Sequence, residues 1–78
     1  MSAIQREYIR NVRKAIRVAN DVKFNTVAYN LQVAWAESYW RNYLKSVESR
    51  NFKTQMDRLK EFLRRKDTHG ALRYLEGH

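Results

Sequence analysis

Residues 24–48 of the chain, FNTVAYNLQVAWAESYWRNYLKSVE, decide the predicted fold. The stretch holds six of the ten aromatic residues and contains neither glycine nor proline. Its apolar residues recur at helical spacing, so we predict a long central helix over residues 26–48, with Asn25 or Thr26 as its N-cap. Two basic and two acidic side chains cancel within it. The net positive charge of the protein therefore lies in the flanking stretches.

The central helix is expected to present two apolar faces. One face consists of Phe24, Val27, Leu31, Ala34 and Trp35, and the other of Tyr29, Val33, Ala36, Trp40, Tyr43, Leu44 and Val47. A helix that is apolar on both sides needs cover on both sides. We therefore expect the helices before and after it to flank and largely enclose it. At about 35 Å it is long for so small a domain, so either one end projects or a second copy of the chain completes its burial.

The stretches on either side are expected to form shorter amphipathic helices. Residues 3–21 follow Ser2 and Gln5, which fit a capping box. Residues 52–66 carry an apolar stripe that begins at Phe52, and Glu61 precedes Arg65 by the four residues that favour an ion pair.

Residues 69–76 are expected to form a short fourth helix after a cap at Asp67 or Thr68. Alternatively, the third helix continues until Gly70 ends it. The sequence thus predicts an all-α fold, a small three-helix bundle with a long central helix and a short C-terminal fourth helix, as one domain over residues 1–78.

Composition restricts the function more than the fold. The chain has 78 residues, no cysteine, and 16 Lys and Arg against 8 Asp and Glu, a net charge of +8. Such a charge attracts nucleic acid, anionic lipid or an acidic protein surface. No apolar run is long enough to span a membrane and no signal peptide is recognisable, so a cytoplasmic protein is expected. Without disulfides, a homodimer is the remaining source of extra buried area.

The first helix carries the most ordered positive charge. Four arginines recur at three- and four-residue spacing opposite its apolar stripe, with one lysine beside them. Arginine suits phosphate because its planar guanidinium offers paired donors and gives up water readily. We interpret this row as a nucleic-acid-backbone site and the basic cluster before the fourth helix as secondary to it, although a solvated basic face is also open. The predicted nucleic-acid-binding residues are Arg6, Arg10, Arg13, Lys14, Arg17, Arg64, Arg65 and Lys66.

The alternative function is a protein–protein adaptor or inhibitor that docks on an acidic or nucleic-acid-binding surface of a partner. Most aromatic residues of the central helix are expected in the core. Trp40 and Tyr43, beside Arg41, are the expected exposed exceptions, because they lie in the half of the helix expected to project. Aromatic and arginine side chains dominate binding energy at such interfaces.

Little in the sequence indicates catalysis. The spacing of Arg64 and His69 is similar to the Arg-x4-His spacing of the all-helical HEPN ribonucleases. There the two residues serve acid–base action and phosphate stabilisation. The resemblance covers six residues, and those domains are normally longer than this chain. No phosphate loop or zinc-ligand spacing is present. We therefore expect a non-enzymatic protein with no metal and no cofactor.

Overall fold

Four α-helices and no strands make up the protein in a computed structural model that describes all 78 residues. They are α1 (Ala3–Asp21), α2 (Thr26–Ser46), α3 (Phe52–Arg64) and α4 (Thr68–Glu76). The all-helical prediction is confirmed. Helices α2 and α3 each end two residues earlier than expected, and α4 begins one residue earlier.

Side chains predicted as caps fix three of the helix starts. Ser2 Oγ accepts a hydrogen bond from the Gln5 N–H at 3.3 Å, and Gln5 Oε1 accepts one from the Ser2 N–H at 2.9 Å, which completes the capping box of α1. Asn25 and Asp67 each accept from a backbone N–H in the first turn of α2 and α4. Each cap satisfies a backbone N–H that has no partner within the helix.

The chain turns sharply between α3 and α4. Lys66 adopts the left-handed conformation, with φ of 59°, and Asp67 follows as N-cap. Gly70 therefore lies inside α4 and does not end α3. A Cβ there would lie 2.7 Å from Cγ of Asp67 and 2.8 Å from Cδ1 of Phe62. Glycine is what allows this close approach of the cap and α3 to α4.

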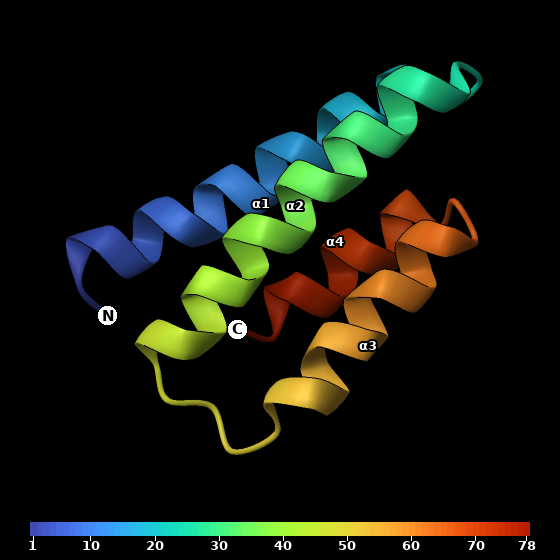
Figure 1. Cartoon of the computed structure of the whole chain (residues 1–78). Coiled ribbons are helices and arrows are strands. Elements are labelled where there is room, and N and C mark those ends of the chain that lie inside the picture. The colour runs from blue at the N-terminus through green and yellow to red at the C-terminus, as the bar shows by residue number, and fades with distance from the viewer.

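The helices form a ring in which α1 contacts α2, α2 contacts α3, α3 contacts α4, and α4 contacts α1. The long α1–α2 hairpin lies beside the shorter α3–α4 hairpin, and both chain ends are at the same end of the molecule (Figure 1). Ala71 and Leu75 of α4 are fully buried, and α1 does not contact α3. The description as a three-helix bundle with an added fourth helix is thus only roughly matched, because α4 is part of the core.

The ring leaves one face of α2 uncovered. Its neighbours α1 and α3 both pack toward the side that carries Tyr29, Ala36 and Trp40, which are buried. The other apolar face remains in solvent, with Trp35 51% exposed. The expectation that flanking helices largely enclose α2 is therefore wrong. Helices packed on opposite sides of α2 would have covered both of its apolar faces. Instead, α4 lies between α1 and α3, and these two helices pack against the same side of α2.

Candidate nucleic-acid interface

Four arginines of α1 lie along one flank of the helix. Arg6, Arg10, Arg13 and Arg17 line a single shallow hollow of about 360 Å³, together with Met1, Ile9 and His78. Since His78 lies two residues beyond Glu76, the last residue of α4, this flank is the one that borders the C-terminal end of α4. Burial of Ile9, Val12 and Ile16 against the core holds the helix in this orientation.

Lys14 is separated from these arginines. It lines a different hollow, between α1 and α2, beside Asn11, Ala15 and Trp35. The helix therefore presents an arginine row of Arg6, Arg10, Arg13 and Arg17 on one flank and a lone lysine on another. Helical spacing alone predicted one group of these four arginines and Lys14, because it does not show which neighbouring helix borders each flank.

The arginine row is almost free of acidic partners. Its one ion pair joins Arg10 Nη1 to Glu7 Oε2 at 3.4 Å, and these side chains are 74% and 55% exposed. Exposed pairs of this kind contribute little, because water screens them. Arg6, Arg13 and Arg17 have no acidic side chain within ion-pair distance. The row thus keeps its donors available for an external anion.

The secondary basic cluster is already engaged within the protein. Arg64 Nη2 and Arg65 Nε both donate to Oε1 of Glu61, at 2.7 and 2.9 Å. Lys66 Nζ donates to the backbone oxygen of Lys23 at 3.2 Å and lies 5.4 Å from the ring centroid of Tyr29. Lys66 therefore ties the α3–α4 turn to the α1–α2 turn, which reduces its availability for a ligand.

Two ionisable groups near these surfaces have displaced pKa values. Hydrogen bonding by Arg64, helped by the positive charges of Arg64 and Arg65, lowers the pKa of the Glu61 carboxyl. Glu61 thus stays ionised and holds both arginines. Partial burial lowers the pKa of the His78 imidazole, whose ring packs edge-on against Trp40 at a centroid distance of 5.2 Å. Near neutral pH, the His78 imidazole therefore adds no positive charge to the arginine-lined hollow.

The aromatic residues expected at a partner interface are buried. Trp40 is fully buried and Tyr43 is 7% exposed, so the expectation that both are exposed is wrong. Their rings stack at a centroid distance of 5.5 Å, and the Trp40 indole N–H donates to the Gln55 backbone oxygen at 3.1 Å. Only Arg41 of this predicted set is exposed. The exposed aromatic residues are instead Phe24, in the turn just before α2, and Trp35, in the N-terminal half of the helix.

A second candidate surface, made of exposed apolar side chains, was therefore not predicted from the sequence. Phe24, Val27, Leu31 and Trp35 form the predicted apolar face that no helix covers. The signal was present in the sequence as the second apolar face of the central helix.

The two residues with the spacing used by ribonucleases belong to different helices. Arg64 ends α3, and His69 lies in α4 beyond the left-handed turn at Lys66. His69 is exposed, and the Arg64 guanidinium is bound to Glu61.

Comparison with known proteins adds no relative: no family model, no curated protein and no solved structure matches the chain. None of the four helices combines the length and apolar character that a membrane crossing requires. Any statement of function consequently depends on the surfaces described above.

Proposed function

We propose that this is a non-enzymatic binding protein whose arginine row contacts the backbone of a nucleic acid. The observation that carries the proposal is the continuous set of four guanidinium groups with a single weak acidic neighbour. Arg6 and Arg17 are eleven residues apart, so the row extends for about 16 Å along the helix. That length exceeds the width of the DNA major groove, about 12 Å, so the row can reach phosphates on both of its edges.

Backbone contact is favoured over the reading of bases. Helix α1 packs against α2 on one side and α4 on the other, so it is not free to enter a groove. Its arginines project from a flank, where their long side chains reach phosphate oxygens. Binding of this kind depends little on base sequence. Arg64 and Arg65 supply a secondary contact only when they release Glu61 and bind a phosphate group in its place.

The salt dependence of affinity tests this proposal on the unmodified protein. Each neutralised phosphate contributes a slope of about −0.9 to a plot of log K against log salt concentration for duplex DNA. We expect a slope of about −3 to −4 from the four arginines, and similar affinities for duplexes of unrelated sequence. Fluorescence anisotropy with a labelled duplex measures both. A slope shallower than about −1 would contradict phosphate binding by the row.

The alternative is an adaptor or inhibitor that docks on a partner protein. The residues predicted to anchor it do not support this function. Trp40 and Tyr43 are part of the core and cannot reach a partner without unfolding. Arg41 alone does not form an interface centre, which normally requires desolvated aromatic or apolar anchors. The nucleic-acid proposal is therefore the one that the surface charge supports best.

A further inference from the structure

The uncovered face of α2 is unusual for a small protein. Its large apolar side chains are 80% (Val27), 56% (Leu31) and 51% (Trp35) exposed, and Phe24, in the turn just before α2, is 98% exposed. Small residues, Ala34 and Ser38, lie beside them on the same face. Single exposed apolar residues are ordinary, but a continuous row of them marks an interaction surface.

This face carries no charge, although the protein as a whole is strongly basic. The only charged residue between positions 24 and 40 is Glu37, which lies on the α3 side, where it lines a hollow with Tyr29 and Lys60. Two copies of this face can therefore approach without bringing like charges together at its centre. A strongly acidic partner would find no complementary charge on the same face.

The size of the face suits a small dimer. From the areas typical of these side chains and their exposed fractions, they present about 500 Å² per molecule. A symmetric pair would bury about 1,000 Å², which is near the lower limit of specific interfaces. The predicted association is accordingly reversible and depends on concentration.

We propose that this face, defined by Phe24, Val27, Leu31 and Trp35, binds the same face of a second copy of the chain. The antiparallel arrangement about a two-fold axis at Leu31 brings the apolar side chains of the two copies together. Leu31 then meets Leu31, and Val27 comes opposite Trp35, because the two are equally distant from the axis. The bulky Trp35 thus faces the smaller Val27, which favours close packing between the two helices, and each face meets itself as two-fold symmetry requires.

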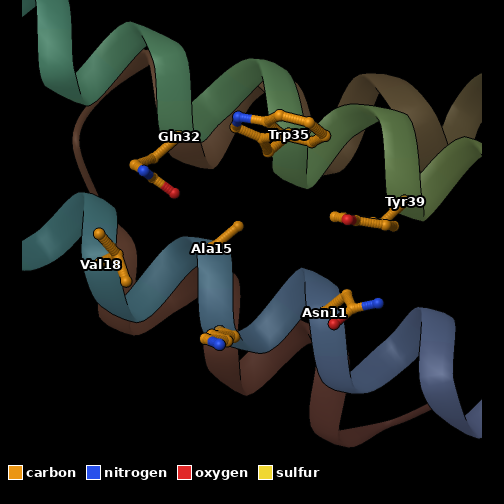
Figure 2. A pocket seen from close by; sticks show the side chains of 7 residues that line it. Asn11, Ala15, Val18, Gln32, Trp35 and Tyr39 are labelled. Atoms are coloured by element: carbon orange, nitrogen blue, oxygen red, sulfur yellow. The ribbon is translucent and has the colours of Figure 1, made fainter.

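A hollow beside the face completes the fit. Trp35 and Tyr39 from α2 face Ala15 and Val18 from α1 across a groove of about 310 Å³ (Figure 2). In the antiparallel arrangement, the first residue of the second copy's α2, Thr26, comes level with Ala36, and Phe24, in the turn just before that helix, is brought toward this groove. Its ring, almost fully exposed in the single chain, is thereby placed to enter this groove.

The arginine row remains accessible in such a pair. It borders α4, whereas the groove and the apolar face lie on the α2 side of the molecule. The dimer therefore does not depend on nucleic-acid binding, and either proposal can fail without the other. If both hold, each dimer carries two separate arginine rows.

Sedimentation equilibrium at physiological salt, without nucleic acid, tests the dimer. The wild type should change from the 9.5 kDa monomer toward twice that mass as concentration rises. Leu31→Glu should remain monomeric, because two buried carboxylates would meet at the axis. Ile4→Glu is the matched control: Ile4 is 60% exposed but lies on α1, and the variant should associate like the wild type.

Mixing Leu31→Glu with Leu31→Lys provides the register test. Each variant alone should be monomeric, whereas the mixture should recover the dimer mass, because the opposite charges meet at the axis. A wild type that stays monomeric at all concentrations would overturn the proposal. Association that survives Leu31→Glu would also overturn the proposed dimer. So would a mixture that stays monomeric, which is the result expected if the face binds a different protein.

Discussion

Replacing Arg6, Arg10, Arg13 and Arg17 together by glutamine is expected to weaken nucleic-acid binding at low salt by at least about 100-fold. Each substitution removes one charge-assisted hydrogen-bonding group, and the combined loss corresponds to about 2.7 kcal/mol or more. The slope of log affinity against log salt should also fall toward zero. Glutamine retains helix propensity, so α1 should remain folded, which circular dichroism verifies.

A control with the same net charge separates the row from general attraction. Arg50, Lys53, Lys60 and Arg73 are exposed and lie outside the row. Their fourfold glutamine variant also lowers the net charge from +8 to +4, but its affinity should change by less than about 5-fold. Equal losses in the two variants would mean that net charge, not the arginine row, determines binding.

Trp40→Ala is expected to have the largest effect on stability. Trp40 is fully buried, stacks on Tyr43, and meets the Tyr74 ring edge-on at a centroid distance of 5.9 Å. Removal of a buried tryptophan side chain costs about 3–5 kcal/mol. A domain of this size has a total stability of about 4–12 kcal/mol. The variant should therefore lose at least about a quarter of the free energy of unfolding, as measured by urea denaturation followed by circular dichroism.

Trp35→Ala is the matched control for Trp40→Ala. Trp35 lies on the same helix but is half exposed, and its removal should cost less than about 1 kcal/mol at concentrations where the protein is monomeric. A Trp40→Ala variant as stable as Trp35→Ala would contradict the position assigned to Trp40 at the centre of the core.

Local features of the fold followed from the sequence because they depend on neighbouring residues. The capping box of Ser2 and Gln5 and the caps at Asn25 and Asp67 were among the predicted starts. The expected pair of Glu61 and Arg65 is also present, at 2.9 Å. Each requires only residues three or four apart, and such contacts are fixed once a helix forms.

The covered face of α2 could not be predicted from periodicity. Trp35 and Trp40 both occur at helical spacing among aliphatic neighbours, yet one is half exposed and the other fully buried. The difference arises from the order of the helices around the core, in particular from the place of α4 between α1 and α3. The arginine row was visible in the sequence, whereas the separation of Lys14 and the engagement of Lys66 depended on tertiary contacts.

Mapping of the contact surface by NMR tests the nucleic-acid proposal most directly. Titration of a short duplex into 15N-labelled protein should shift the side-chain Nε–H signals of Arg6, Arg10, Arg13 and Arg17 and the backbone amides of that flank. The indole N–H of Trp35, on the far side of the α1–α2 groove, should not shift. Shifts concentrated at Trp35 and Leu31, with the arginine signals unchanged, would contradict the arginine row as the binding site.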